Sequence, residues 1–191
     1  MKATFALLPP SKVHNLVRRL AWEAHTRQHI ATLAARLPAH VSLKISFDIN
    51  NLDYLEKYMD ELVTQTAPLE ITLTELQLIE MGETGILWLD VVQTPALRRL
   101  HFRILNDLCA RLGDGARVEP DGEAYHFHMT VAMGKPLHAF QQAYAAMNTC
   151  AAHTTFTARD LCLFLYDDQG GQDESYITYK ILPLKGKLSP S

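Results

Sequence analysis

The sequence alternates strictly between polar and apolar residues in one stretch, His40-Val41-Ser42-Leu43-Lys44-Ile45-Ser46-Phe47-Asp48-Ile49. Successive side chains of a β-strand point to opposite faces of a sheet. The pattern therefore predicts a strand over residues 40–49, with an apolar face packed on a core. The opposite, polar face is expected to line an open cleft, and its first two residues are a histidine and a serine.

A second stretch, over residues 126–133, alternates in the same way. Both stretches contain a histidine, any residue, a hydroxyl residue and a large apolar residue. The two copies are His40-Val41-Ser42-Leu43 and His128-Met129-Thr130-Val131. Because positions i and i+2 of a strand share a face, each copy presents an imidazole beside a hydroxyl.

Short motifs of this kind also arise by chance. A third match, His153-Thr154-Thr155, follows a predicted helix and precedes any clear alternation, so we interpret it as the chance occurrence. The other two copies each belong to an alternating strand, at corresponding points of the chain. That correspondence favours a functional role over two unrelated surface or core histidines.

The order of predicted elements repeats along the chain. The first half contains a strand at 4–8, a helix at 11–37, the strand at 40–49, a helix at 52–66 and strands at 69–80 and 86–92. The second half contains a helix at 95–112, a loop at 113–122, the second alternating strand, a helix to about residue 150 and strands at 156–166 and 176–184.

This order predicts an α+β fold with two pseudo-symmetric lobes of mainly antiparallel sheet. Helices are expected on the outer faces, and the polar strand faces are expected to line a central cleft. The length of 191 residues fits a single two-lobed domain, with approximate halves 1–93 and 94–191.

Composition narrows the class of protein and of ligand. Hydrophobic residues make up 48% of the chain, enough for a core, and the formal net charge is −3 with no basic run. A long nucleic-acid duplex is therefore a poor partner, and a small or terminal phosphate is a better one. The odd set Cys109, Cys150 and Cys162 predicts reduced thiols rather than a disulfide framework or a cysteine zinc site. No apolar stretch is long enough to span a bilayer, and we expect a cytoplasmic protein.

The paired motifs suit displacement at phosphorus. Such a reaction needs a base on the attacking oxygen and an acid on the leaving oxygen, roughly in line. Histidine, with a reference pKa of about 6.5, can serve as either near neutral pH. The hydroxyls can donate hydrogen bonds to the non-bridging oxygens. Lys44, on the same predicted polar face, is either a phosphate contact or a solvated lysine.

At these residues the chain resembles the two-histidine (2H) phosphoesterase superfamily, which includes 2′-5′ RNA ligase-like proteins and cyclic phosphodiesterases. The two motifs match the family signature. The opening Thr4-Phe5-Ala6-Leu7-Leu8-Pro9-Pro10 looks like the family's first strand, and residues 40–47 look closest to a bacterial, YjcG-like branch.

The resemblance implies a 2′-5′ RNA ligase-like fold that hydrolyses or forms phosphodiester bonds without a metal or cofactor. Typical substrates would be 2′,3′-cyclic phosphates or 2′-5′ linkages on RNA ends or nucleotides. Carried over, His40 and His128 are the acid and base, and Ser42 and Thr130 bind the phosphate. The resemblance does not assign which histidine is the base.

Several alternatives remain open from the sequence. The sequence leaves three possible roles for His126: it contacts the substrate, it is the solvated end of a strand, or it binds a metal ion together with His128. The last is considered because two histidines in a His-x-His pattern on a strand can bind one metal ion. The sequence also leaves open whether three aromatic residues lie in the core or stack on a nucleobase: Trp88, Tyr166 and Tyr176. The protein as a whole could instead be a non-catalytic nucleotide-binding or RNA-end-binding protein that uses the same cleft.

Overall fold

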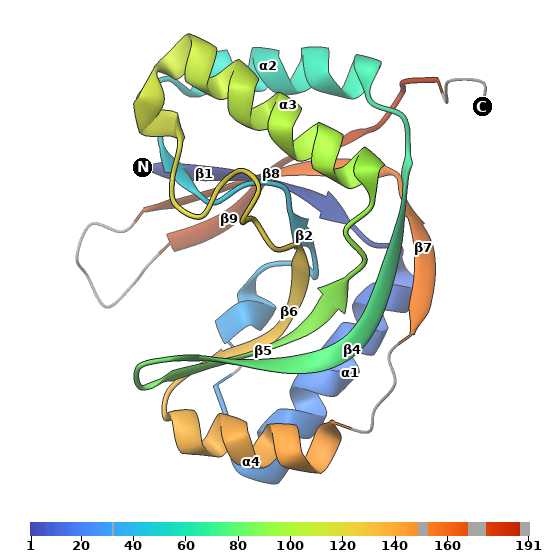
Figure 1. The fold of residues 1–191 in the computed structure, drawn as a ribbon, viewed down its shortest axis with the longest axis vertical. Coiled ribbons are helices and arrows are strands. Elements are labelled where there is room, and N and C mark those ends of the chain that lie inside the picture. The colour runs from blue at the N-terminus through green and yellow to red at the C-terminus, as the bar shows by residue number, and fades with distance from the viewer. Residues whose placement is uncertain (32, 149–152, 168–174, 188–191) are drawn as a thin grey trace.

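The computed structural model describes residues 1–31, 33–148, 153–167 and 175–187. In this part of the chain, two antiparallel β-sheets face each other between two layers of helices (Figure 1). From top to bottom of Figure 1 follow α2 and α3, the first sheet, the second sheet, and α4 with α1. The predicted α+β class, with helices outside antiparallel sheets, is confirmed.

The strands divide between the sheets as follows. The first sheet contains β1 (Lys2–Leu8), β2 (Val41–Ser42), β3 (Phe47–Asp48), β8 (Asp160–Asp167) and β9 (Ser175–Pro183), in the order β2-β1-β8-β9, with β3 also paired to β1. The second sheet contains β4 (Leu69–Met81), β5 (Thr84–Val91), β6 (His128–Gly134) and β7 (Thr154–Ala158), in the order β6-β5-β4-β7. Each sheet thus combines strands from both halves of the chain.

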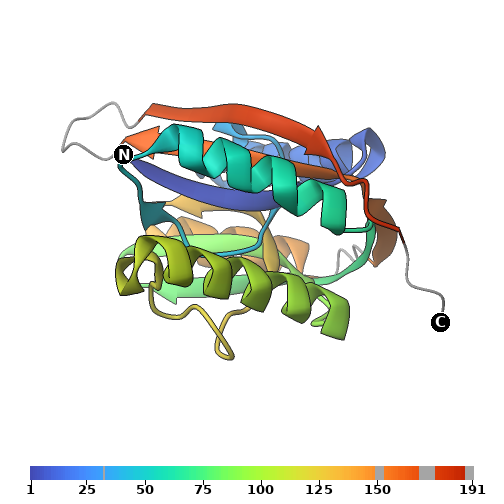
Figure 2. The same cartoon turned by 90° about the horizontal axis from the view of Figure 1, so that it is seen from above.

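The helices cover the outer faces. Helix α2 (Leu52–Gln65) lies against the first sheet, and α3 (Pro95–Leu112) runs beside it (Figure 2). Helices α1 (Ser11–Gln28) and α4 (Leu137–Met147) pack on the second sheet. Two short 3-10 helices, η1 (Leu33–Arg36) and η2 (Asp114–Ala116), lie in the connections. None of the helices in the described ranges is both long and apolar enough to cross a membrane.

The apolar residues of both motifs anchor their strands in the core. Val41, Leu43, Met129 and Val131 have no solvent exposure. Burying a side chain of this size contributes about 1.5–3 kcal/mol. The alternation predicted next to each histidine is therefore correct, and these apolar residues anchor both motif strands. The predicted alternation breaks further along the second stretch, where Ala132 is buried and Met133 is 42% exposed.

The predicted helix over residues 11–37 is too long. Helix α1 ends at Gln28 because His29 adopts a left-handed conformation (φ 52°) and its N–H donates to the carbonyl of His25. Ile30, just beyond this end, is completely buried. Helix α4 likewise ends earlier than predicted, and Cys150 lies outside the described residues. Cys109 is half-buried, Cys162 is buried, and both are free thiols.

Two predicted strands are divided. The stretch 156–166 belongs to β7 and β8, which lie in different sheets on either side of Arg159. The stretch 40–49 pairs with β1 at residues 41–42 and 47–48, and the N–H of Leu43 also donates to the carbonyl of Phe5 at 2.8 Å. Between these pairs the chain leaves the strand conformation, because side chains bind its carbonyl groups, as described below.

Candidate active site

The two motifs meet where the edges of the two sheets adjoin. Strand β2 is the edge of the first sheet, β6 is the edge of the second, and the two strands are in contact. His40 directly precedes β2, and His128 is the first residue of β6. Strands that are remote in the sequence thus bring the two signatures together.

His40 and His128 are held in the same way. The Nδ1 atom of His40 lies 2.8 Å from the carbonyl oxygen of Pro38, and that of His128 lies 2.9 Å from the carbonyl oxygen of His126. In both cases the carbonyl belongs to the residue two positions earlier. Because a carbonyl can only accept, Nδ1 carries the proton in each neutral ring, and Nε2 presents its lone pair.

An aromatic ring also supports each imidazole. His40 packs on Phe164 of β8, with ring centroids 4.6 Å apart. His128 stacks on Trp88 of β5 at 4.0 Å, with the rings 20° from parallel. The sequence left open whether Trp88 belongs to the core or stacks on a base. In the structure its ring stacks on the ring of His128.

Two adjoining hollows of about 240 and 260 Å³ open beside the motifs. His40 and Thr130 line the first, whereas Ser42 and His128 line the second. Each hollow therefore combines the histidine of one motif with the hydroxyl residue of the other. Tyr176 lines both hollows and connects them.

The surroundings make both imidazoles weaker bases than in water. Burial lowers the pKa of His40 to about 4, the charges of His128 and Arg18 also lower it, and the hydrogen bond to Pro38 opposes this change. Burial also lowers the pKa of His128, while the Asp90 carboxylate acts to raise it. Both rings are therefore mainly neutral at pH 7 in the free protein, and His128 has the environment that favours protonation more.

Helix α1 fixes the segment that leads into His40. The Nη2 atom of Arg18 donates to the carbonyl of Leu37, and Nδ1 of His14 accepts from the N–H of Ala39 at 3.2 Å. Sequence analysis did not single out either residue. Both lie on one side of an amphipathic helix, where a polar side chain within reach of the buried face is a signal that could have identified them.

Lys44 takes a different place from the one predicted. Its ammonium lies 2.8 Å from Oδ2 of Asp121, and neither side chain is exposed to solvent. It also donates to the carbonyl of Ile45. The alternative of a solvated lysine is therefore wrong, because the side chain is buried. Lys44 is among the residues that line the second of the two hollows, and its role as a phosphate contact stays a prediction.

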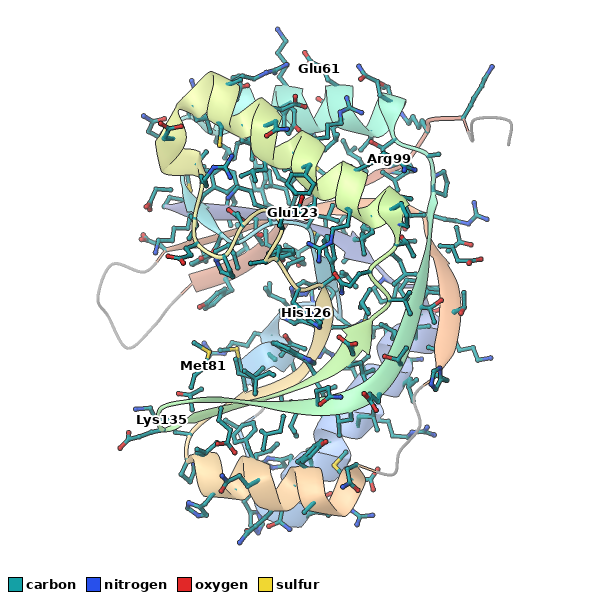
Figure 3. The ribbon with its side chains drawn as sticks, viewed as in Figure 1. Glu61, Met81, Arg99, Glu123, His126 and Lys135 are labelled. Atoms are coloured by element: carbon teal, nitrogen blue, oxygen red, sulfur yellow. The ribbon has the colours of Figure 1, made fainter. Side chains whose placement is uncertain are left out.

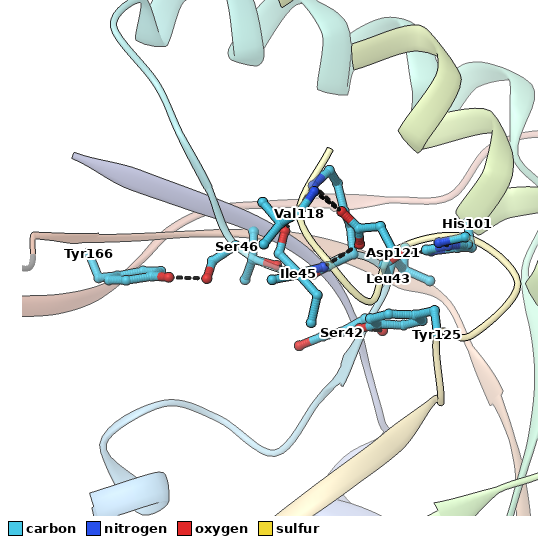
Figure 4. A network of polar contacts seen from close by, with 12 residues as sticks. Ser42, Leu43, Ile45, Ser46, His101, Val118, Asp121, Tyr125 and Tyr166 are labelled. Carbon is cyan, nitrogen blue, oxygen red and sulfur yellow. Dashed lines mark hydrogen bonds and ion pairs between the residues drawn. The ribbon is translucent and has the colours of Figure 1, made fainter. Parts of the chain in front are cut away.

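Side chains bind four consecutive carbonyl groups, which begin at Ser42 of the first motif and end at Ile45. Those of residues 42, 43, 44 and 45 are bound by Tyr125 (3.0 Å), His101 (2.7 Å), Thr4 (2.7 Å) and Lys44 (3.1 Å), respectively. Figure 4 shows Tyr125 and His101 reaching this segment from the other half of the chain. These contacts hold the chain between β2 and β3 in one irregular path.

His101 holds two segments through its two ring nitrogens. Nδ1 donates to Leu43, and Nε2 accepts from the N–H of Gly122 at 2.9 Å. The ring is fully buried and stacks on Tyr125. Sequence analysis missed this residue, although a histidine on the apolar stripe of Leu97, Leu100 and Ile104 was a readable signal.

His126 lies between the two sheets, just before β6 (Figure 3). Its Nε2 pairs with Oδ1 of Asp90, and its ring stacks on Trp88 at 5.7 Å. Within the ranges that the structure describes, no three His, Cys, Asp or Glu side chains gather as a potential metal site. His153, in the third motif match, is an exposed residue next to β7.

Comparison with known protein families identifies one match. The sequence model of the 2′-5′ RNA ligase superfamily matches residues 9–170, which includes both motifs. No curated protein sequence matches the chain.

Solved structures share the fold over nearly the whole chain. TT0787 of Thermus thermophilus matches with a TM-score of 0.72 and 12% identity, over 98% of this chain and 100% of that one. E. coli LigT complexed with NADP+ matches with a TM-score of 0.57 and 16% identity, over 96% of each chain. LigT complexed with 3′-AMP gives 0.56 and 15%, over 96% of this chain and 97% of that one. At these identities the likeness concerns the fold, and it confirms the predicted 2′-5′ RNA ligase-like architecture.

Proposed function

The chain belongs to the 2′-5′ RNA ligase superfamily of 2H phosphoesterases, and we propose that it hydrolyses a 2′,3′-cyclic phosphate on a nucleotide or RNA end. One observation carries the proposal: the histidine of each motif shares a hollow with the hydroxyl residue of the other. A phosphate between the motifs would then meet an imidazole from each strand. It would also meet the hydroxyls of Ser42 and Thr130.

His40 acts as the base in this proposal. Its Nε2 removes a proton from a water molecule as the water oxygen attacks phosphorus. His128 acts as the acid, and its protonated Nε2 gives a proton to the ribose oxygen as the bond from phosphorus to that oxygen breaks. The product is a nucleotide with a phosphomonoester and a free hydroxyl. The two imidazoles then exchange protons with solvent and return to their starting states.

The electrostatic difference between the rings supports this order of roles. Burial and the nearby charge of Arg18 lower the pKa of His40 and keep the ring neutral, which is the form a base requires. Burial lowers the pKa of His128 as well, but the hydrogen bond to the carbonyl of His126 and the Asp90 carboxylate oppose this change and so favour the protonated form, which is the form an acid requires. A bound phosphate, being negative, favours that form further. Ser42 and Thr130 donate hydrogen bonds to the non-bridging oxygens, where charge develops in the transition state.

Nucleotides are the ligand class that the comparisons support. Solved structures of LigT, which shares this fold, include complexes with 3′-AMP and with NADP+. The net charge of −3 and the absence of a basic run in the sequence favour a small or terminal phosphate.

A direct test is turnover of 2′,3′-cyclic AMP in the presence of a chelator, followed by chromatography of the product. We expect His40→Ala and His128→Ala each to lower kcat/KM by about 10²–10⁴-fold, the usual contribution of an acid or base. His153→Ala is the matched control, because it removes an exposed histidine of the third motif match. It should leave turnover unchanged.

Other outcomes identify the competing functions. Binding of the nucleotide without turnover would indicate a non-catalytic binding protein. Turnover that appears only with added metal and disappears in His126→Ala would indicate a metal-dependent hydrolase.

A further inference from the structure

An aromatic row follows the cleft side of the first sheet, starting at His40. Phe164, which contacts the His40 ring, and Tyr166 are two residues apart on β8 and therefore share a face. Tyr176 of β9 is paired with Tyr166 across the two strands. The two tyrosine rings stack at 5.2 Å, 18° from parallel. The motif histidine and the tyrosine pair thus belong to one continuous surface.

Tyr176 occupies the central position in the cleft. It lines both hollows, and 36% of its surface is exposed. Tyr166 lines the second hollow, and its hydroxyl donates to Oγ of Ser46, as Figure 4 shows. This hydrogen bond fixes the plane of the Tyr166 ring and, through stacking, favours one orientation of Tyr176. The two stacked rings thus form an ordered aromatic surface beside the hydroxyl residues Ser42 and Ser46, which line the same hollow.

The spacing along β8 suits a nucleotide. Two residues of a strand span roughly 6–7 Å, so Tyr166 lies about that far from the ring that supports His40. The ribose of a nucleotide separates its base from its 2′ and 3′ oxygens by a distance of the same order. A phosphate held at His40 would therefore bring its own base to the tyrosines.

We propose that Tyr176 and Tyr166 form a nucleobase-binding site for the nucleotide that carries the reacting phosphate. This inference rests on the proposed function and names the part of the substrate that the cleft recognises beyond the phosphate. Aromatic rings stack on any base, because every base has a π-face. The site therefore accepts all four bases with modest preference, and a cyclic phosphate that lacks a base is turned over less efficiently.

Trp88 does not serve this role. Its indole stacks on His128 at 4.0 Å and on His126 at 5.7 Å, so it supports the two imidazoles. Among the three aromatic residues that the sequence left open, the tyrosine pair is assigned to the base and Trp88 to the positioning of His128.

The test compares two substrates in three variants. We would measure kcat/KM for 2′,3′-cyclic AMP and for the 2,3-cyclic phosphate of 1-O-methylribose, which has no base. Tyr176→Ala should lower the value for cyclic AMP by roughly 10- to 100-fold, as loss of one stacked base predicts. It should leave the value for the base-free substrate unchanged, and Tyr176→Phe should retain the activity on cyclic AMP.

Tyr179→Ala is the matched control. This tyrosine lies three residues further along β9, is similarly exposed at 38%, and donates its hydroxyl to Glu56 of α2. The control should leave both substrates unaffected. Circular dichroism of each variant checks that it is folded. An equal loss on both substrates, or no loss on either, would overturn the base-binding site while leaving the phosphoesterase proposal in place.

A second measurement does not depend on turnover. Calorimetric titration with adenosine 2′-phosphate and with 1-O-methylribose 2-phosphate compares binding with and without a base at the same phosphate position. Tyr176→Ala should weaken the first and not the second. If wild-type protein turns over neither cyclic phosphate yet shows this difference, the proposed function fails and the base site stands. If wild-type protein binds neither ligand, both fail.

Discussion

Lys44 and Asp121 lie 77 residues apart in the chain and form an ion pair from which solvent is fully excluded. The same carboxylate accepts hydrogen bonds from the N–H groups of Ile45 (3.0 Å) and Val118 (2.9 Å). One side chain therefore ties the segment after the first motif to the loop before the second.

Asp121→Asn should strongly destabilise the protein. The substitution keeps the size of the side chain but leaves the Lys44 ammonium buried without a counter-charge, which costs about 3–5 kcal/mol in comparable cases. Urea unfolding followed by fluorescence measures the free energy. Glu83→Gln is the control, because it breaks the exposed pair between Lys135 and Glu83 and should have little effect. Similar losses in both variants would contradict a special role for the buried pair.

Tyr125→Phe tests whether the carbonyl contacts position the first motif. The change removes only the hydroxyl that donates to the Ser42 carbonyl, so we expect a stability loss of about 1–2 kcal/mol. We also expect a lower kcat with little change in KM, because Ser42 would be less well positioned during the reaction. Tyr179→Phe, on the outer side of β9, provides the comparison. A wild-type kcat in Tyr125→Phe would show that this contact is purely structural.

The pH dependence of kcat/KM should be bell-shaped and displaced to acid pH. A neutral His40 is required, so activity should fall as pH drops through its pKa of about 4. A protonated His128 is also required, so activity should fall again as pH rises through its pKa, which burial places below the ordinary value of 6.5. In His40→Ala the acidic limb should vanish and the residual rate should decline with rising pH. A residual rate that increases with pH would reverse the acid and base roles.

Arg18 should affect the acidic limb of that profile. Its positive charge lowers the pKa of His40, so Arg18→Gln should move the limb to higher pH. The limb should stay below the ordinary histidine pKa of 6.5, because burial of the ring is the larger cause. Arg18→Lys retains the charge and is the comparison. A limb that does not move in Arg18→Gln would mean that the charge of Arg18 does not reach the His40 ring.

Local patterns were enough to identify the two motifs and most of the helices and strands. The alternation around His40 and His128, and the full burial of their apolar neighbours, depend on residues one or two positions away. The position of Lys44 could not be predicted in this way, because its partner is remote in the sequence. The division of residues 156–166 between two sheets, at Arg159, likewise follows from strand pairing and not from local alternation.

The same limit applies to the groups that position the site. His101 binds Leu43 across 58 residues, and Tyr125 binds Ser42 across 83. Their residue types carry no sign of these partners, although a histidine on an apolar helix stripe suggests a buried hydrogen bond. The end of α1 at His29 was missed because the left-handed conformation there is adopted by a residue other than glycine or asparagine.

His40 should also make the stability of the protein depend on pH, whatever the substrate. Its pKa is about 4 in the folded protein and about 6.5 when unfolded. The unfolded state therefore binds more protons between these values, and the free energy of unfolding should decrease as pH falls from about 6.5 to about 4. The contribution of His40 is at most about 3–4 kcal/mol, and less where water reaches the half-buried ring. Chemical unfolding of wild-type protein and His40→Gln between about pH 4 and pH 7 measures it. The variant should lose less stability toward low pH, whereas parallel curves would show that the His40 imidazole titrates alike in both states.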